Sequence, residues 1–298
     1  MKRGSAQRRG VSVQIRNGTY PTARGNSCHS NLPRLVSLIK YCTCRPTSVP
    51  CFMPAPSPLP ENTGLAFLGE AAWPAALLTE RAAEKLLATA NRCGRPNADV
   101  LRRRLAVLDG EPVEQWQIDF PTHFTSQEAA LYEQPFAMLQ QRGAGALPAP
   151  GANPELRRAL ARLTRYLALP AAATTPDWRW IEDDLLPDAT LLVVARDDDF
   201  THGVLSSRAF GLWWHAHCAQ LGPVATVAAF PFPWPPATAL SVLTKAQEEQ
   251  RHAIARAARS GNEEQLNSAV SAAYGWATES DVSELLGNLT ALNGRRGQ

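Results

Sequence analysis

The sequence predicts an α+β protein in which a mixed domain of short strands and helices precedes a helical C-terminal tail. Leu191–Ala195 is a short apolar run bounded by charge, which is typical of a buried strand. Trp116, Ile118 and Phe120 alternate with polar residues, as in a half-buried strand. From Leu240 onward the chain is rich in Ala, Glu, Gln and Arg at helical spacing. The expected divisions are a basic extension over residues 1–58, the mixed domain over 59–236 and the tail over 237–298.

The N-terminal extension differs from the rest of the chain in charge. Residues 1–60 contain nine Lys or Arg and no Asp or Glu, and five prolines from Pro46 to Pro58 disfavour regular structure. We expect a disordered tail, or the product of a truncated or out-of-frame start of a bacterial gene. An organellar transit peptide has a similar composition, but no continuous amphipathic helix accompanies it here.

The remaining residues carry 21 basic and 27 acidic side chains, a net charge of −6. A protein that binds DNA neutralises phosphates with basic residues, so this part would need local basic clusters or a more basic partner. A hydrophobic content of 45% indicates a globular protein. No apolar run approaches the roughly 18 residues of a membrane span, and we expect a cytoplasmic protein with no membrane partner.

The cysteines and histidines give no convincing metal site. Cys42 and Cys44 lack the two-residue separation of a zinc knuckle, and His215, His217 and His252 are scattered. We therefore expect reduced, incidental thiols and no metal. The six cysteines are Cys28, Cys42, Cys44, Cys51, Cys93 and Cys218.

The first predicted helix of the mixed domain begins at Thr79, in the segment TERAAEKLLATA. Asn91–Asn97 ends this helix in a turn that contains a glycine and a proline. Arg102–Arg104 follow directly. Three consecutive arginines either contact phosphate or form a solvated face.

A strand and a capped helix come next. We interpret Asp119, at the end of the Trp116–Phe120 strand, as a cap of the following turn, because no paired acid or nucleophile accompanies it. Thr125 and Glu128 form a Thr-x-x-Glu capping box, which predicts a helix that runs to Pro135.

The helix expected from Pro154 carries the best electrostatic candidate for a DNA contact. The preceding residues 142–153 are rich in Gly, Ala and Pro and indicate a loop. Arg158, Arg162 and Arg165 fall at i, i+4 and i+7, which predicts three guanidinium groups on one helical face, and Tyr166 would extend this face with a stacking surface. A solvated helical face is the equally ordinary explanation.

Beyond the strand at 191–195 the chain is predicted to be mainly helical. Asp197–Asp199 end this strand, and apolar residues recur at helical spacing from Gly203 to Trp214. Residues 230–236 (FPFPWPP) indicate a stiff segment packed on a core, with a polyproline ligand or a stacking platform as the alternative. Helices are expected over residues 240–260, 263–273 and 281–293, and Asp281 would cap the last one.

Four stretches, taken in order, resemble the C-terminal target-recognising region of large adenine-specific DNA methyltransferases of the MmeI-like class. The central match is Ala195–Trp214 (ARDDDFTHGVLSSRAFGLWW), which is similar to an Ala-Arg-Asp-Asp-Tyr, Gly-Val-Leu-x-Ser signature with a following Trp. The other three are Asn91–Leu101 (NRCGRPNADVL), Gln115–Phe136 (QWQIDFPTHFTSQEAALYEQPF) and the AAYGW and LLGNLTALN segments within Leu266–Asn293. The resemblance extends from about Leu59 to the C-terminus.

This resemblance implies a target-recognition domain followed by a helical tail. The family's complete enzymes use S-adenosylmethionine to methylate adenine N6 in double-stranded DNA, so the implied partners are duplex DNA and a separate catalytic domain. In this chain the candidate DNA contacts are backbone contacts by three arginines and groove contacts by loop residues near 166–179 and 206–208. The residues are Arg158, Arg162, Arg165, Tyr166, Arg179, Ser206 and Arg208.

The sequence departs from the family at the residues of chemistry and of base recognition. Neither a glycine-bearing strand-to-helix turn for the cofactor nor an Asn-Pro-Pro-aromatic loop for a flipped base is present, so we expect no catalytic residues and no bound cofactor in this chain. Ala171–Pro176 (AAATTP) replaces a basic, polar recognition loop. An inactive relic that docks on a methyltransferase or restriction partner is the alternative, and an independent enzyme is disfavoured.

Overall fold

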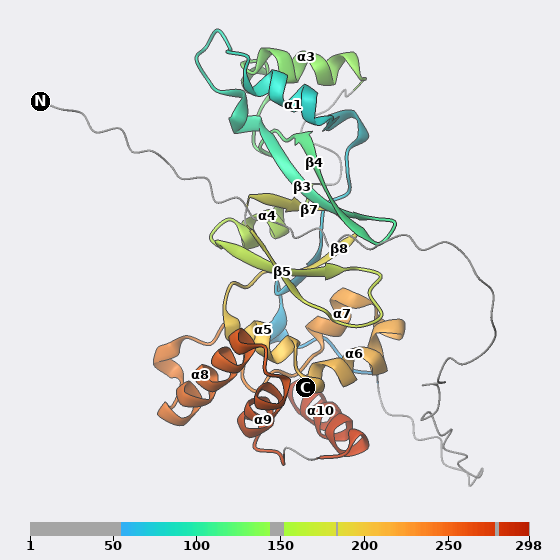
Figure 1. Cartoon of the computed structure of the whole chain (residues 1–298), viewed down its shortest axis with the longest axis vertical. Coiled ribbons are helices and arrows are strands. Elements are labelled where there is room, and N and C mark those ends of the chain that lie inside the picture. The colour runs from blue at the N-terminus through green and yellow to red at the C-terminus, as the bar shows by residue number, and fades with distance from the viewer. Residues whose placement is uncertain (1–54, 144–151, 183, 278–279, 298) are drawn as a thin grey trace, which may run out of the picture. The chain divides into compact units, whose positions relative to one another are not determined.

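The computed structural model describes residues 55–143, 152–182, 184–277 and 280–297. Within them the strands form two four-stranded sheets (Figure 1). The first sheet is antiparallel throughout and has the order β1 (Ala66–Leu68), β8 (Leu191–Val194), β5 (Arg165–Pro170), β6 (Arg179–Glu182). The second has the order β2 (Leu77–Leu78), β4 (Glu111–Ile118), β3 (Leu101–Leu108), β7 (Leu185–Pro187), and β7 is parallel to β3.

The buried strand predicted at 191–195 is confirmed as β8, and its position explains why its sequence is continuously apolar. Leu192 and Val194 pack into the core beneath the helices, whereas Leu191 and Val193 pack toward β3 and helix α4 (Pro154–Leu160). All four side chains are buried. Because both faces of this strand are covered, polar residues do not alternate with apolar ones along it.

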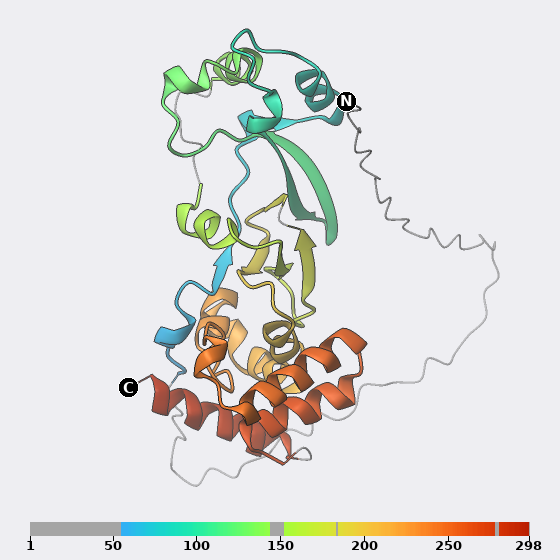
Figure 2. The same ribbon diagram turned by 90° about the vertical axis from the view of Figure 1, so that its left-hand side faces the viewer.

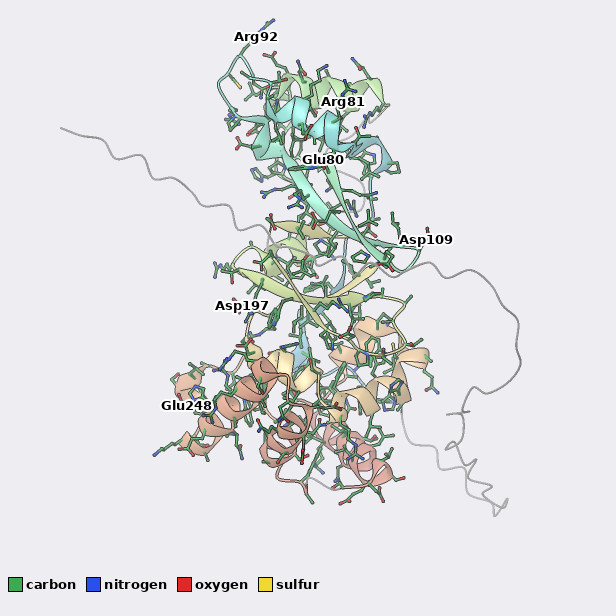
Figure 3. The ribbon with its side chains drawn as sticks, viewed as in Figure 1. Glu80, Arg81, Arg92, Asp109, Asp197 and Glu248 are labelled. Carbon is green, nitrogen blue, oxygen red and sulfur yellow. The ribbon has the colours of Figure 1, made fainter. Side chains whose placement is uncertain are left out.

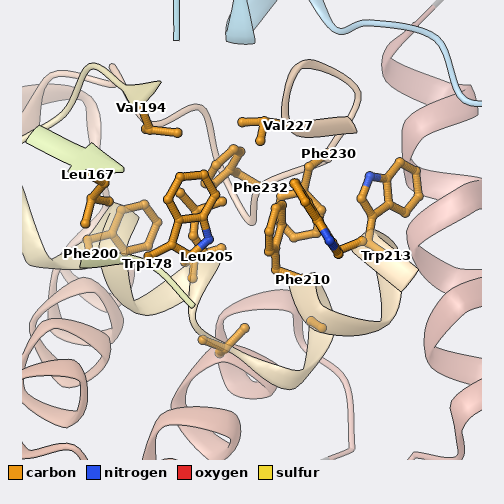
Figure 4. Close-up of a cluster of buried hydrophobic side chains, with 14 of the residues drawn as sticks. Leu167, Trp178, Val194, Phe200, Leu205, Phe210, Trp213, Val227, Phe230 and Phe232 are labelled. Atoms are coloured by element: carbon orange, nitrogen blue, oxygen red, sulfur yellow. The ribbon is translucent and has the colours of Figure 1, made fainter. Parts of the chain in front are cut away.

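The helical core contains most of the aromatic residues. It is formed by α5 (Asp199–Leu205), α6 (Arg208–Leu221), α7 (Pro223–Ala228), α8 (Lys245–Ser260), α9 (Glu263–Tyr274) and α10 (Val282–Arg296). Phe210, Trp213 and Phe230 lie at its centre, where edge-to-face and tilted ring contacts join them to neighbouring rings (Figure 4). The Trp213 indole N–H donates to the Thr226 carbonyl at 3.0 Å, which satisfies the one polar group of this fully buried side chain.

The helix predicted from Gly203 to Trp214 is interrupted. Helix α5 begins four residues earlier, at Asp199, because Asp198 caps it by accepting from the Thr201 backbone N–H at 2.9 Å. It ends at Leu205, and Ser207 then caps a second helix, α6. The hydroxyl of Ser207 donates to the Val204 carbonyl at 2.7 Å. The apolar spacing was therefore correct, but two serines divide the segment into two capped helices.

The aromatic and proline segment 230–236 packs on the core, as predicted. Phe230, Phe232 and Trp234 are buried. The Asn62 side-chain amide donates to the Phe230 carbonyl at 2.8 Å, and that of Asn293 donates to the Ala229 carbonyl at 2.7 Å. The C-terminal helices α8, α9 and α10 share this core with α5 and α6. The boundary between mixed domain and tail at residue 236 stays a prediction.

A smaller core covers the second sheet. Helix α1 (Glu80–Leu87) begins at Thr79 as predicted, and its Leu86 packs with Ile118 and Phe120. The predicted Thr125 capping box is present, but it begins a single turn, α2 (Ser126–Ala129), and a separate helix, α3 (Glu133–Gln141), follows. The expected end at Pro135 is therefore wrong, because proline is tolerated in the first turn of α3. Short 3₁₀ turns complete the fold: η1 (Pro60–Asn62), η2 (Pro74–Ala76), η3 (Asn97–Val100) and η4 (Leu240–Val242).

The predicted α+β class with helical C-terminal residues is confirmed, and α8, α9 and α10 lie close to the ranges expected for them. Figure 2 shows these three helices together at the opposite end of the described chain from α1. No helix in the described ranges is long and apolar enough to cross a membrane. Of the extension predicted over residues 1–58, residues 1–54 lie outside the described residues. Ser57 is described, and its backbone exchanges hydrogen bonds with Asn293 of α10.

Candidate nucleic-acid interface

The structure divides the three arginines that were predicted to share one helical face. Helix α4 begins at Pro154 as expected and is capped by Asn153, but it ends at Leu160. Arg158 and Arg162 are exposed on this helix and on the turn after it, whereas Arg165 is the first residue of β5. The prediction of one shared helical face was wrong, because Tyr166–Leu169 is a buried strand segment that pairs with β8 and β6. This strand pairing overrides the helical spacing of the arginines.

Arg165 belongs to an ion-pair cluster beside the helices. Its guanidinium donates to Asp199 at 2.8 Å and lies 3.8 Å from the centre of the Trp180 ring. Asp199 also accepts from Arg259 of α8 at 2.6 Å. Burial raises the pKa of Asp199, but the hydrogen bonds and charges of Arg259 and Arg165 outweigh burial and hold this pKa below its usual value. The cluster thus joins the first sheet to α5 and α8.

Tyr166 does not offer the predicted stacking surface. Its ring is completely buried in the core between the two sheets, and its hydroxyl donates to the Leu185 carbonyl at 2.7 Å. Burial raises the pKa of this phenol well above its usual value. Alternate residues of a strand point to opposite faces, so the face that carries Tyr166 is turned away from that of Arg165.

Arg179 lies on the opposite face of the first sheet from Arg165. Arg179 pairs across the strands with Ala168, and Arg165 pairs with Glu182, three positions along β5. Cross-strand partners share a face, and an odd separation reverses it. Arg179 forms an exposed ion pair with Asp177 at 3.0 Å. Such a pair is weak in water, so the guanidinium stays available to another partner.

A groove of about 580 Å³ lies beside Arg179, between the β3–β4 hairpin and the loop after β5. The hairpin turns at Asp109 and Gly110, both with positive φ, which is the geometry that tight hairpin turns require. The altered loop Ala171–Pro176 supplies one wall of the groove through Ala173, Thr174 and Thr175. The groove is therefore lined by apolar groups, two hydroxyls and few charges.

Ser206 and Arg208 lie apart from these residues, at the junction of α5 and α6. Ser206 is exposed at the C-cap of α5. The Arg208 backbone N–H donates to the Asn267 side chain at 2.8 Å, and its guanidinium contacts the Ser280 carbonyl at 3.3 Å. Both contacts lead to the C-terminal helices. The seven predicted residues therefore form no single cluster within the described chain.

Sequence reasoning missed a buried network of charges between the two sheets. Arg157 donates to Glu70 at 2.5 and 2.6 Å and to Asp119 at 2.8 and 2.9 Å. Burial lowers the pKa of Arg157, but these two carboxylates outweigh burial and raise it above its usual value. The interpretation of Asp119 as a turn cap is therefore wrong, because its carboxylate is held by an arginine 38 residues later in the chain.

The arginine run at 102–104 contributes to the same region. Arg102 and Arg104 share one face of β3, and Arg103 lies on the other face, where it pairs with Glu114. Arg102 is exposed near the start of the strand, whereas Arg104 is fully buried. Arg104 pairs with Asp188 and donates to Gln117 at 2.7 Å. Neither a phosphate contact nor a solvated face describes Arg104. A cavity of about 350 Å³ borders the network, lined by Glu70, Arg102, Asp119, Arg157, Asp184 and the β7 backbone.

The described residues contain no group of three or more His, Cys, Asp or Glu placed to hold a metal ion. Cys93 and Cys218 are free thiols, and the other four cysteines lie outside the described residues. Burial lowers the pKa of His217 and raises that of Cys218. Neither group lines the groove or the cavity beside Arg157.

No protein-family model and no curated protein matches the sequence. Among solved structures, the chain is similar to the type IIL restriction-modification enzyme MmeI in complex with DNA, with a TM-score of 0.50 and 14% sequence identity. The match covers 82% of this chain and 36% of MmeI. The chain therefore spans about a third of the length of that enzyme, and at this identity the similarity shows a shared fold.

Proposed function

We propose that this chain binds double-stranded DNA as the target-recognition part of a restriction-modification methyltransferase. The observation that carries the proposal is the fold, which is shared over 82% of the chain with an enzyme solved in complex with DNA. The four ordered motifs support the same family, although the sequence lacks the cofactor and base-flipping motifs. A separate catalytic domain would supply S-adenosylmethionine binding and adenine N6 methylation.

Arg158 and Arg162 are the strongest candidates for phosphate contacts. Both are exposed, and neither has an ion-pair partner among the described residues. An exposed guanidinium binds phosphate oxygens without first giving up an internal partner. Arg165 would contribute less, because it already pairs with the half-buried Asp199, whereas the exposed pair with Asp177 leaves Arg179 available.

The groove beside Arg179 is the candidate for contacts with base edges. It is flanked by a hairpin and by a loop, elements that reach away from a rigid sheet. Its hydroxyls, Thr174 and Thr175, accept and donate hydrogen bonds to either purines or pyrimidines. With these side chains we expect weak discrimination between DNA sequences, and we expect contacts with the DNA phosphate backbone to supply most of the affinity.

The test is fluorescence anisotropy of labelled duplex DNA over a series of salt concentrations. The double variant R158A/R162A should bind more weakly, and the slope of log affinity against log salt should fall by about 2, roughly one for each lost phosphate contact. The matched control is R81A/R92A, which removes two exposed arginines from the region around α1 (Figure 3). Equal losses in both double variants, or no binding by the unchanged chain, would refute the proposal.

A second candidate is an interaction protein that docks on a methyltransferase or restriction partner. Two observations favour it: residues 61–298 carry a net charge of −6, and Leu240 and Val242 are 54% and 73% exposed. Exposed apolar side chains of this size more often belong to protein interfaces than to DNA contacts. Complex formation with a purified methyltransferase subunit, without measurable DNA affinity, would support docking over DNA recognition.

A further inference from the structure

The outer face of α8 carries basic residues that the sequence analysis did not connect with DNA. His252, Arg256 and Arg259 stand at i, i+4 and i+7, so they project from one side of the helix. The inner side is fixed, because Ile254 and Ala257 are buried in the core. The two arginines and the histidine therefore project from a rigid element.

This face is accessible and slightly concave. Together with Glu249 and Ala255, these three residues line a shallow surface cavity of about 420 Å³. His252 and Arg256 are exposed, and Arg256 has no ion-pair partner among the residues that the structure describes. The small Ala255 side chain lies among these longer side chains in the lining.

A shared carboxylate connects the α8 face to the predicted arginines. Asp199 accepts from Arg259 at 2.6 Å and from Arg165 at 2.8 Å, so these two guanidinium groups converge on one side chain. Arg165 follows Arg162 by three residues along the chain. In Figure 3, Asp197, whose carbonyl accepts from Arg165, and Glu248 of α8 lie on the same side of the view.

We propose that the outer face of α8 is a second phosphate-binding surface for double-stranded DNA, continuous with Arg158 and Arg162 through Arg165 and Arg259. The inference rests on the proposed function and extends its binding surface to the C-terminal helices. Arg256 and Arg259 are separated by about 5 Å of helix axis, and long arginine side chains from such a spacing reach neighbouring phosphates.

The test compares two charge reversals in the intact chain, R256E on α8 and R81E on α1. R256E should weaken duplex binding roughly three- to tenfold and lower the salt slope by about 1, whereas R81E should bind like the unchanged chain. Thermal unfolding followed by circular dichroism should give the same transition for both variants, since both side chains are exposed. Arg259 is left unchanged, because its loss would also remove an ion-pair partner of Asp199.

Three outcomes separate this inference from the function on which it rests. Weaker binding of R256E but not of R81E supports the α8 surface. Unchanged binding of R256E, with weaker binding of R158A/R162A, overturns the α8 surface and leaves the DNA-binding proposal intact. Absence of binding by the unchanged chain overturns both.

Discussion

The helical core and the junction between the two sheets are stabilised in different ways. The helical core is apolar and aromatic, and its Phe230 ring contacts both Phe210 and Trp213. The junction combines an apolar cluster around Tyr166 with buried ion pairs of Arg104 and Arg157. Apolar packing accepts any partner of suitable shape, whereas a buried charge needs a particular opposite charge. The junction therefore depends more strongly on individual residues.

The largest expected effect is at Arg157. Replacing it with alanine leaves Glu70 and Asp119 buried without their shared cation, which should lower the free energy of unfolding by about 3–5 kcal/mol. Its sequence neighbour supplies the control, because Arg158 is exposed and R158A should change stability by no more than about 0.5 kcal/mol. Urea denaturation measures both. Similar stabilities of the two variants would mean that the junction does not depend on its ion pairs.

The helical core was easier to predict from the sequence than the junction, because the junction depends on ion pairs between residues far apart in the chain. The buried strand at 191–194 and the helix starts at Thr79, Pro154 and Asp281 were predictable because they depend on local spacing and side-chain chemistry. The Arg157 network joins residues up to 87 positions apart, and no local pattern records such a pairing. The arginine spacing at 158–165 matched a helix, but the pairing of β5 with its neighbours decided the conformation there.

The candidate site was predictable only in part for the same reason. Arg158 on α4 and Arg162 on the turn after it are both exposed, because this property depends on a short local segment. The burial of Tyr166 and the convergence of Arg165 and Arg259 on Asp199 depend on how distant elements pack. The basic face of α8 was visible as a spacing at 252, 256 and 259, and its significance emerges only beside Arg165.

The second effect tests how closely the helical core is packed. A Cβ added at Gly203 of α5 would lie 2.7 Å from Cγ2 of Ile254 on α8, whereas one added at Gly211 of α6 meets nothing within 4 Å. Overpacking costs about 1–3 kcal/mol, and alanine returns up to about 1 kcal/mol of helix propensity at either position. G203A should therefore lose about 1–2 kcal/mol of stability and G211A should gain slightly. A stable G203A would show that α8 can move away from α5.

A smaller effect is expected at the start of α5, where the helical core meets the first sheet. Asp198 accepts from the Thr201 backbone N–H at 2.9 Å and pairs with Arg196 at 2.9 Å. D198A should cost about 1 kcal/mol through the lost helix cap. Asp197 is the control, since its side chain makes no hydrogen bond within the described residues. Thermal unfolding of D198A and D197A gives the comparison. If both variants lose the same stability, the effect comes from the negative charge of the turn and not from the cap.

The smallest expected effect is a pH dependence at the same boundary. His202 of α5 lies beside Trp180, with ring centres 5.2 Å apart, and it faces both Asp199 and Arg165. Burial lowers its pKa, and the attraction of Asp199 does not offset burial together with the repulsion from Arg165. The unfolded chain therefore binds a proton more readily than the folded chain does. The contribution of neutral His202 to the free energy of unfolding is complete above the unfolded histidine pKa of about 6.5. It is lost as pH falls through the lower pKa of the folded chain.

The pH effect can be separated from that of the other buried histidine. His217 has a pKa lowered by burial as well, so it contributes a slope of the same sign. H202Q should reduce the fall in unfolding free energy between about pH 7 and about pH 5, and H202Q/H217Q should reduce it further. Urea denaturation at several pH values measures these slopes. If H202Q keeps the slope of the unchanged chain, protons reach His202 in the folded state, and the contact between the first sheet and α5 is looser than the helical core behind it.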